Sequence, residues 1–378
     1  MKNFLLLLCP MVALSQVTLR VTSVPGDTPP GAVIFLAGTV NGWNPSHPDY
    51  ALTPWDGIYT ITIPEQTGEV SYKFTRGNWT TAEGDAAGGH LPNRTFTFTG
   101  KPQTLSVNIL SWQAEPMSTA AANVSILDDE FPVPQLNTKR RIWLYLPPDY
   151  VTSDKRYPVI YMHDGQNVFD AATSFSGEWG VDETLNELFA KGDYGAIVVA
   201  IDNGGPERLN EYSPWRNPDY ATGGKGAAYM EFVANTLKPY IDANYRTRPQ
   251  PQFSALIGSS MGGLISTYGA LEHPDKFLKI GSMSPAYWFA SEALQDYISR
   301  YKADLSKHRI YILAGINEWP KMIETTDPIK ESLKQKGVKK ENLFKFYHPE
   351  GTHTEAFWKS TFSEVYQWLF ADVAPGKP

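Results

Sequence analysis

The stretch Gly258-Ser259-Ser260-Met261-Gly262-Gly263 decides the fold class of this 378-residue chain. The apolar run Ala255-Leu256-Ile257 precedes it, and a helical pattern starts near Met261, so the stretch turns a strand into a helix. Glycine lies two positions before and two positions after Ser260, where a Cβ would collide with the neighbouring strand or helix. The pattern predicts a nucleophile elbow, with Ser260 at a helix N-terminus where developing negative charge is stabilised.

The region 124–378 alternates apolar, strand-like runs with segments of helical periodicity. Such alternation with short connections is typical of a mostly parallel sheet covered by helices on both faces, so the predicted fold class is α/β. The predicted strands are 141–146, 157–162, 196–201, 253–257, 277–282, 309–314 and 343–347, and the predicted helices are 181–191, 226–243, 261–272, 291–303, 326–336 and 355–370.

A serine nucleophile of this kind needs an acid and a histidine base, which follow it along the chain in that order. His353 lies in the loop before the last predicted helix, after a flexible Gly-Thr pair, and is the predicted base; His348 in the same loop is the alternative. Glu318 is the first carboxylate after the preceding strand, and we expect it to orient His353 and stabilise its cation. Glu324 and Asp327 are the alternative acids, a few residues later.

An oxyanion hole in such a site needs two backbone N–H groups. One is that of Met261, directly after the predicted nucleophile. We expect the other to be that of Gln166, in the loop after an earlier strand, because Gly165 permits an unusual backbone turn there. His163 and Asp164 begin this loop, but one His-Asp pair without further ligands does not predict a metal site.

Residues 16–112 show a different pattern, in which apolar and polar residues alternate within short runs. Turn residues separate these runs at roughly ten-residue intervals, which is typical of a β-sandwich. The segment 113–123 is rich in small and polar residues and is predicted to be a linker. The sequence therefore predicts two domains, a small all-β sandwich over 16–112 and the α/β domain over 124–378.

The first fifteen residues are predicted to be a signal peptide rather than part of the fold. A short basic start precedes an apolar run from Phe4 to Leu14, and small residues stand before Gln16. The single cysteine, Cys9, falls in this segment, which excludes an intramolecular disulfide framework and a cysteine-rich zinc site. We therefore expect a secreted or periplasmic protein, and no other run predicts a transmembrane helix.

Charge and aromatic content narrow the possible partners. The chain has 33 basic and 40 acidic residues, a formal net charge of −7, which argues against a nucleic-acid-binding protein. Aromatic residues make up 13% of the chain, and this content favours a surface on which flat or sugar-like ligands stack.

Five ordered motifs between about residues 124 and 371 resemble one family of α/β-hydrolases. That family includes the enterochelin esterases, S-formylglutathione hydrolase, and the feruloyl and acetyl-xylan esterases. The motifs are Met162-His163-Asp164-Gly165-Gln166-Asn167-Val168-Phe169-Asp170, Ile201-Asp202-Asn203-Gly204-Gly205, Asn210-Glu211-Tyr212-Ser213-Pro214-Trp215, Gly258-Ser259-Ser260-Met261-Gly262-Gly263 and Gly351-Thr352-His353-Thr354-Glu355-Ala356-Phe357-Trp358.

This resemblance implies an α/β-hydrolase fold and serine ester hydrolysis without a metal or organic cofactor. It maps the nucleophile onto Ser260, the base onto His353 and the acid onto Glu318, where many relatives have Asp instead. It further implies a substrate loop, and the residues that would line it are Asn203, Glu211, Tyr212 and Trp215.

The N-terminal region is similar to the starch- or glycogen-binding β-sandwich modules over about residues 17 to 110. The similarity rests on the stretches 35–45, 72–79 and 93–95. It implies that Trp43 and Trp79 stack on glucose rings of an α-glucan. Similar sandwiches also precede enterochelin esterase domains, where they help to shape the active site, so capping is the alternative role.

The combined expectation is a secreted serine carboxylester hydrolase that cleaves acetyl or feruloyl esters on plant polysaccharides. A siderophore trilactone of the enterochelin type is the alternative substrate, although its negative charge calls for a basic pocket and Arg208 and Arg216 are the candidate cations. Two rival classes are an inactive carbohydrate-binding protein and a serine peptidase. The intact elbow with a later acid and histidine argues against the first, and no anchor for a peptide terminus supports the second.

Overall fold

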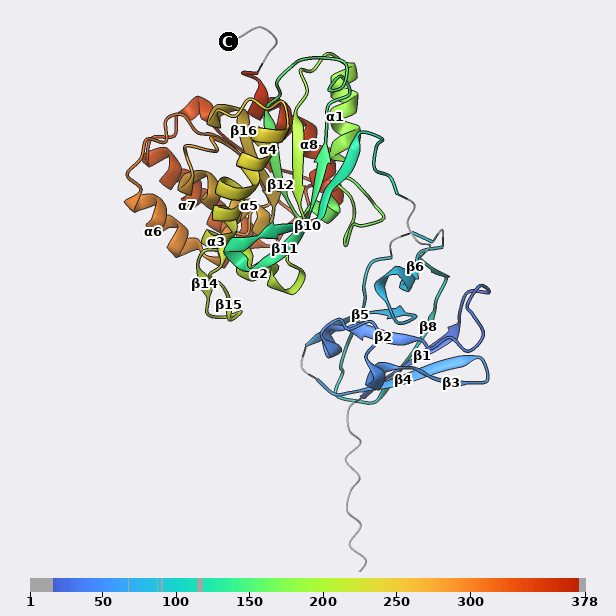
Figure 1. Cartoon of the computed structure of the whole chain (residues 1–378). Helices are drawn as coiled ribbons and strands as arrows, with labels where there is room; N and C mark the ends of the chain where they lie inside the picture. Colours follow the sequence, from blue (N-terminus) through green and yellow to red (C-terminus); the bar gives the residue numbers. More distant parts are fainter. Residues whose placement is uncertain (1–15, 67, 87, 90, 114–117, 374–378) are drawn as a thin grey trace, which may run out of the picture. The chain divides into compact units, whose positions relative to one another are not determined.

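The computed structural model describes residues 16–66, 68–86, 88–89, 91–113 and 118–373, which fall into two compact units, Met1–Met117 and Ser118–Pro378 (Figure 1). The predicted signal peptide, residues 1–15, lies outside the described residues, as do residues 114–117 of the predicted linker. Across the described ranges, none of the helices combines the length and the apolar character needed to cross a membrane.

The C-terminal unit is built on an eight-stranded sheet of order β10-β11-β13-β12-β16-β17-β18-β19. The two pairings at one edge, β10 with β11 and β11 with β13, are antiparallel, and all the others are parallel. The predicted mostly parallel sheet is therefore confirmed. The strands are β10 (Val124–Val133), β11 (Thr138–Tyr145), β12 (Val159–His163), β13 (Ile197–Ile201), β16 (Ser254–Ser259), β17 (Lys279–Met283), β18 (Arg309–Gly315) and β19 (Leu343–His348).

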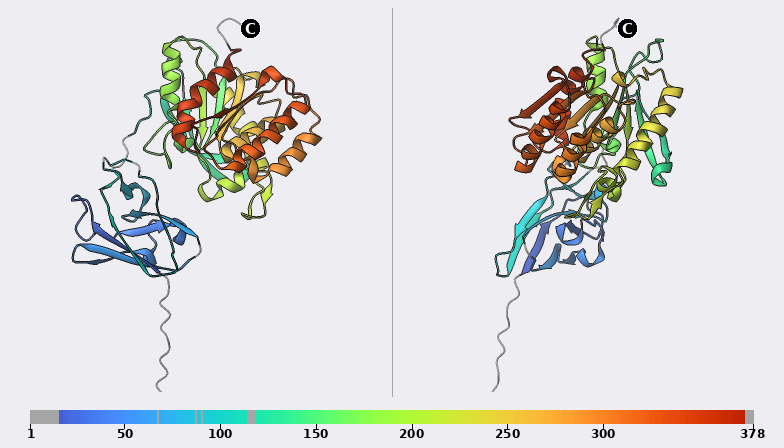
Figure 2. Two further views of the ribbon diagram at one scale, coloured as in Figure 1. Left: turned by 180° about the vertical axis from the view of Figure 1, so that it is seen from behind. Right: turned by 90° about the vertical axis from the view of Figure 1, so that its left-hand side faces the viewer.

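Helices cover both faces of this sheet (Figure 2), because successive side chains of each strand point to opposite sides. In β12, Val159 and Tyr161 join one buried cluster, and Ile160 and Met162 join the other. The second cluster lies under α1 (Val181–Ala190) and α8 (Glu355–Phe370). The first lies under α3 (Gly226–Phe232), α4 (Lys238–Asn244), α5 (Met261–Glu272), α6 (Ser291–Arg300) and α7 (Pro320–Gln335).

Several elements differ from the sequence prediction. Helix α7 begins at Pro320, six residues before the predicted 326–336. The expected helix 226–243 is divided, because a π-helical segment, Val233–Leu237, separates α3 from α4. Strand β10 was not predicted, since the acidic run Asp128-Asp129-Glu130 breaks its apolar pattern. The register of β10 against β11 shifts twice around this run, so the charged residues bulge from an exposed edge strand.

The N-terminal unit contains a four-stranded sheet of order β3-β4-β1-β8 and a three-stranded sheet of order β2-β5-β7. Alternate residues of both sheets share one buried cluster, for example Val17 and Leu19 from β1 with Val70 and Tyr72 from β5, so the arrangement is that of a sandwich. The strands are β1 (Gln16–Ser23), β2 (Phe35–Gly38), β3 (Thr53–Trp55), β4 (Ile58–Pro64), β5 (Glu69–Thr75), β7 (Arg94–Thr97) and β8 (Gln103–Asn108), and a short pair joins β6 (Glu83–Gly84) to β9 (Ser111–Trp112).

Candidate active site

Ser260 lies in the sharp turn between β16 and α5, with φ 55° and ψ −121°. This is a conformation that L-residues rarely adopt, and the surrounding packing holds it in place. A Cβ on Gly258 would lie 2.7 Å from the carbonyl carbon of Gly262, so the turn requires glycine at position 258. The strained turn lifts the Ser260 side chain to the C-terminal edge of the sheet, where it is partly exposed.

The end of β17 and the segment after it support the backbone of this turn. The N–H of Ser260 donates to the carbonyl oxygen of Met283 at 2.9 Å, and the N–H of Ala286 donates to the carbonyl oxygen of Ser260 at 2.8 Å. Between them, Ser284 has φ 43° and a fully buried side chain. The elbow and the residues around Ser284 therefore form one hydrogen-bonded unit.

Glu318 and His353 lie together at the same edge of the sheet. Oε2 of Glu318 is 2.9 Å from Nδ1 of His353, and the side chain of Glu318 is wholly buried. Oε1 accepts hydrogen bonds from the Ser284 hydroxyl at 2.7 Å and from the N–H of Gly315 at 2.6 Å. Because an ionised carboxylate only accepts, Nδ1 of His353 carries the proton in this contact and Nε2 is left as the basic nitrogen.

The imidazole of His353 is held between two indole rings. The ring of Trp319 is 4.8 Å away, centroid to centroid, and that of Trp358 packs edge-on at 5.1 Å. Nε1 of Trp358 donates to the Ser284 hydroxyl at 2.9 Å, so the same serine contacts both the acid and a support of the histidine. Ser284 and Trp319 were not predicted as site residues, whereas Trp358 stands within the last sequence motif.

The alternative acid and base residues lie in different environments. Asp327 pairs with Lys345 and accepts a 2.9 Å hydrogen bond from the hydroxyl of Tyr347, and Glu324 is exposed. Nδ1 of His348 accepts from the N–H of Glu350 at 3.2 Å. The structure thus joins Glu318 to His353 and gives Asp327 and His348 other partners.

The loop after β12 lies against the start of α5. A Cβ on Gly262 would lie 3.4 Å from the Cβ of His163, the last residue of β12, and 3.5 Å from Oδ2 of Asp164, so this loop and the elbow are immediate neighbours. Gln166 falls in the short 3₁₀ helix Gly165–Asn167, and Met261 is the first residue of α5. N–H groups in the first turn of an α-helix have no partner within it, which applies to Met261, and the role of both predicted donors toward an oxyanion stays a prediction.

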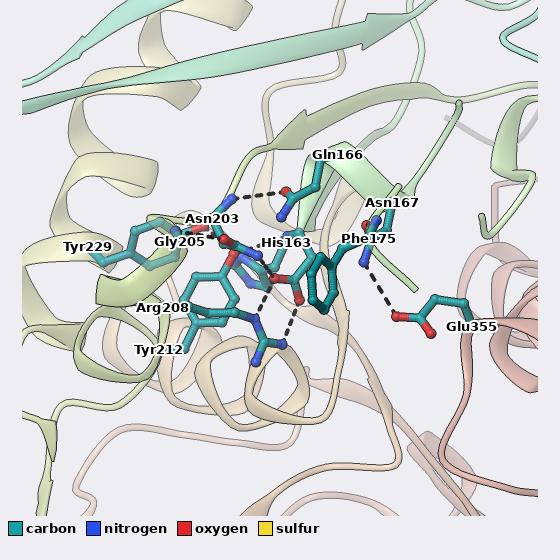
Figure 3. Close-up of polar contacts among 11 residues, drawn as sticks. His163, Gln166, Asn167, Phe175, Asn203, Gly205, Arg208, Tyr212, Tyr229 and Glu355 are labelled. Carbon is teal, nitrogen blue, oxygen red and sulfur yellow. Dashed lines mark hydrogen bonds and ion pairs between the residues drawn. The ribbon is translucent and has the colours of Figure 1, made fainter. Parts of the chain in front are cut away.

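The unusual backbone of this loop belongs to Asp164 rather than to Gly165. Asp164 has φ 58°, whereas Gly165 is required for space, since a Cβ there would lie 2.7 Å from the backbone of Ile201. Nε and Nη2 of Arg208 donate to the Asp164 carboxylate at 2.6 and 2.8 Å, and Nδ2 of Asn203 donates to it at 2.7 Å (Figure 3). The backbone N–H of Asn203 donates to Oε1 of Gln166 at 3.2 Å, so this network fixes the loop.

Burial and neighbouring charges shift the pKa values of Asp164, His163 and Glu355. Burial acts to raise the pKa of Asp164, but the guanidinium of Arg208 outweighs it and holds that pKa below its usual value. Burial lowers the pKa of His163 to about 4, so its imidazole is neutral near pH 7 while Nδ1 contacts the hydroxyl of Tyr229 at 2.8 Å. Burial also raises the pKa of Glu355, whose carboxylate accepts from Nδ2 of Asn167 at 3.4 Å.

The residues predicted to line a substrate loop occupy several environments. Tyr212 is fully buried, and its hydroxyl accepts from the N–H of Asp164 at 3.0 Å. Glu211 is buried in an ion pair with Arg140. Trp215 packs edge-on against Tyr268 and Tyr297, at 5.5 and 5.9 Å. Their role toward a substrate stays a prediction, and Asn203 is the one of the four that directly contacts the side chain of Gln166.

A family model described as "Putative esterase" matches residues 134–369, which is more than half of the chain. The chain belongs to this esterase family. The protein, called the esterase below, is therefore a carboxylic ester hydrolase. The predicted family, the α/β-hydrolase fold and the enzyme class are confirmed.

Several known proteins are similar to the esterase. An uncharacterised protein of Bacillus subtilis, YbbA, is 30% identical over 61% of the esterase and 92% of its own length. An endo-1,4-β-xylanase/feruloyl esterase of Xylanibacter ruminicola is 26% identical over 60% of the esterase and 29% of its own length. An α-amylase of Niallia circulans is 46% identical over 26% of the esterase and 8% of its own length. A crystal structure of the enterobactin esterase of Shigella flexneri superposes with a TM-score of 0.55 at 16% identity, covering 90% of the esterase and 89% of that chain, which shows a shared fold.

The N-terminal unit of the esterase brings its two predicted sugar-binding tryptophans together. The rings of Trp43 and Trp79 are 6.2 Å apart, centroid to centroid, at 40°, and both are partly exposed. The side chain of Asn41 holds the first loop by accepting from the N–H of Gly38 and donating to the carbonyl oxygen of Leu36. Two adjoining, partly exposed rings on braced loops can form a platform for a flat ligand.

Three acidic side chains form a cluster at the start of α1 in the C-terminal unit of the esterase. One carboxylate oxygen each from Glu178, Asp182 and Glu183 lies within 4.8 Å of the others. Nζ of Lys359 approaches Glu178 at 3.4 Å, and Oδ2 of Asp182 accepts from the N–H of Ala121 at 2.7 Å. The contact with Ala121 anchors the first residues of the unit to α1.

Proposed function

We propose that Ser260, His353 and Glu318 form a catalytic triad that hydrolyses carboxylic esters. The observation that carries this proposal is the hydrogen-bonded connection from the Ser260 backbone through the segment 283–286 to Glu318 and His353. These hydrogen bonds connect the elbow, the acid and the base, and so fix the positions of the three relative to one another. Preorganisation of this kind is what nucleophilic catalysis by serine requires.

In the proposed mechanism, the Ser260 hydroxyl attacks the ester carbonyl while Nε2 of His353 takes its proton. The N–H groups of Met261 and Gln166 donate to the oxygen that becomes negative in the tetrahedral intermediate. His353 then gives the proton to the leaving alcohol, and Glu318 stabilises the imidazolium throughout. A water molecule repeats these steps on the acyl-enzyme and releases the acid and free Ser260.

We propose acetyl or feruloyl esters of plant polysaccharides as the substrate. The similarity to a xylanase/feruloyl esterase supports this class, and so does the net charge of −7. A polyanionic siderophore calls for an available cation, but Arg208 is committed to Asp164 by two hydrogen bonds. The fold shared with an enterobactin esterase keeps a siderophore trilactone as the second candidate, with Arg216, which is exposed, as its cation.

The deciding experiment measures initial rates on p-nitrophenyl acetate, methyl ferulate, acetylated xylan and ferric enterobactin, for wild type and Ser260→Ala. We expect Ser260→Ala to lower turnover by on the order of 10⁶-fold with an unchanged circular dichroism spectrum. Wild-type turnover of glycan or ferulate esters supports polysaccharide breakdown, and turnover of the siderophore alone supports the second candidate. A folded Ser260→Ala variant with wild-type rates would exclude the triad.

We further propose that the N-terminal sandwich, over 16–112, binds an α-glucan through Trp43 and Trp79. The adjoining partly exposed rings and the similarity to an α-amylase support this role. Trp43→Ala with Trp79→Ala is expected to weaken retention on soluble starch in affinity electrophoresis, while Trp55→Ala, an exposed tryptophan on β3, is the control. Equal retention of all three forms would argue for a structural role. The segment 1–15 is proposed as a signal peptide and 124–378 as the catalytic domain. Residues 118–123 of the predicted linker belong to the second compact unit, to which Ser118 and Ala121 are hydrogen-bonded.

A further inference from the structure

Three aromatic side chains extend outward from His353, and we call Trp319, Trp288 and Tyr220 the aromatic wall. The Trp319 ring is 4.8 Å from the imidazole, the Trp288 ring is 6.3 Å from that of Trp319, and the Tyr220 ring is 5.7 Å from that of Trp288. Three separate segments supply them. Trp319 directly precedes α7, Trp288 lies in the 3₁₀ helix Tyr287–Phe289 after β17, and Tyr220 lies between β14 (Arg216–Asn217) and β15 (Thr222–Gly223).

The aromatic wall is open to solvent. Tyr220 is 56% exposed and Trp319 is 44% exposed, while Trp288 is partly exposed. Burial of aromatic surface is favourable, so a contiguous group of exposed aromatic rings indicates a binding surface. Trp and Tyr rings offer an apolar face that packs against C–H groups, and the hydroxyl of Tyr220 can also meet a polar group of a ligand. Nε1 of Trp288 is buried, so this ring contributes its apolar face.

The position of His353 determines which part of an ester would reach the aromatic wall. In the proposed mechanism the histidine gives its proton to the leaving alcohol, so the alcohol oxygen must lie within hydrogen-bond reach of Nε2. The carbonyl oxygen instead points to the N–H groups of Met261 and Gln166. Trp319, at the inner end of the wall, packs on the imidazole ring that would protonate this alcohol. This contact favours the alcohol side of the scissile bond as the side that the wall flanks.

We infer that the aromatic wall binds the alcohol part of the ester and that this alcohol is a sugar ring of an oligosaccharide. Trp288 and Tyr220 would then pack against the C–H face of rings that extend away from the ester. The inference rests on the proposed triad and adds a specificity determinant to it. It also separates recognition of the sugar from recognition of the acyl group.

The test compares two esters of the same acid that differ in the alcohol. One pair is methyl ferulate and a feruloylated arabino-oligosaccharide, and the other is methyl acetate and an acetylated xylo-oligosaccharide. The measured quantity is kcat/KM for the sugar ester divided by kcat/KM for the methyl ester, because this ratio cancels effects on the shared acyl group. Trp288→Ala and Tyr220→Ala are compared with Trp288→Phe, which keeps a ring, and with Tyr240→Ala, an exposed tyrosine on α4 outside the wall.

We expect each alanine variant in the wall to lower the ratio by about tenfold, as expected for one lost aromatic contact. Trp288→Phe should lower the ratio less than Trp288→Ala, and Tyr240→Ala should keep the wild-type ratio. Equal losses on both members of a pair would assign the wall to the acyl group or to folding, and would overturn the inference. So would a wild-type enzyme that turns over p-nitrophenyl acetate but does not prefer the sugar ester in either pair. Turnover that survives Ser260→Ala would instead refute the triad on which the inference rests.

Discussion

The hydroxyl of Ser284 donates a 2.7 Å hydrogen bond to Oε1 of Glu318. The N–H of Gly315 donates to the same oxygen, so Oε2 is the oxygen that remains for His353. Ser284 therefore determines which carboxylate oxygen orients the imidazole, although it lies outside the sequence motifs. Its neighbours Met283 and Ala286 hold the backbone of Ser260, which links the acid to the nucleophile through one short segment.

Glu318→Gln is expected to lower kcat/KM on p-nitrophenyl acetate by on the order of 10⁴-fold. Two donors converge on Oε1, so the amide oxygen of glutamine takes that place and its NH₂ group faces Nδ1 of His353. An NH₂ group there donates to Nδ1 and moves the proton to Nε2, which can no longer act as a base. Ser284→Ala removes one of the two donors and should cost about tenfold, with the melting temperature as the check on folding. Rates for Glu318→Gln within tenfold of wild type would contradict the role of the acid.

The glycines of the elbow are expected to differ in their tolerance of alanine. A Cβ at position 258 would lie 2.7 Å from the Gly262 carbonyl carbon, one at position 263 would lie 3.1 Å from Pro285 Cα, and one at position 262 would lie 3.4 Å from His163 Cβ. Gly258→Ala should therefore destabilise most, by about 1–3 kcal/mol, Gly263→Ala less and Gly262→Ala least. Thermal unfolding of the three variants measures this order. A Gly258→Ala variant as stable as Gly262→Ala would show that the turn relaxes easily.

Elements whose signal lies within one stretch of sequence could be predicted, and contacts between distant segments could not. The elbow has a strand, a turn and a helix within one stretch, so its glycine spacing could be interpreted directly. Strand β10 was missed because its acidic residues bulge at an exposed edge, which removes the alternation that identifies strands. The aromatic wall was missed because Trp319, Trp288 and Tyr220 lie on three loops, and no spacing in the sequence indicates that these loops meet.

Arg208→Lys is expected to lower both stability and turnover. Lysine keeps the positive charge but cannot make the paired contacts that hold Asp164, and Asp164 belongs to the loop that carries Gln166. We expect a loss of about 1–3 kcal/mol in unfolding free energy, and a fall in kcat of about 10- to 100-fold if the loop shifts. Lys225→Arg, at an exposed ion pair with Glu207, is the matched control and should change neither quantity. Unchanged kcat in Arg208→Lys would mean that the position of this loop does not limit catalysis.

Asp182→Asn is expected to stabilise the protein above neutral pH. Asp182 is fully buried on α1, its Oδ1 has no hydrogen-bond partner within the described part of the chain, and Glu183 lies close by. Burial, with a further contribution from Glu183, raises the pKa of Asp182 above its usual value. The folded state therefore holds this proton more tightly than the unfolded state, so the stability it contributes is present at acid pH and is lost as pH rises through the folded-state pKa.

Asparagine has no proton to lose and can still accept from the N–H of Ala121. The melting temperature of Asp182→Asn minus that of wild type should thus be larger at about pH 8 than at about pH 4, by about 2–4 °C for each kcal/mol. Asp275→Asn, an exposed carboxylate, should give the same difference at both pH values. A pH-independent difference for Asp182→Asn would mean that the pKa of Asp182 is the same in the folded and unfolded states.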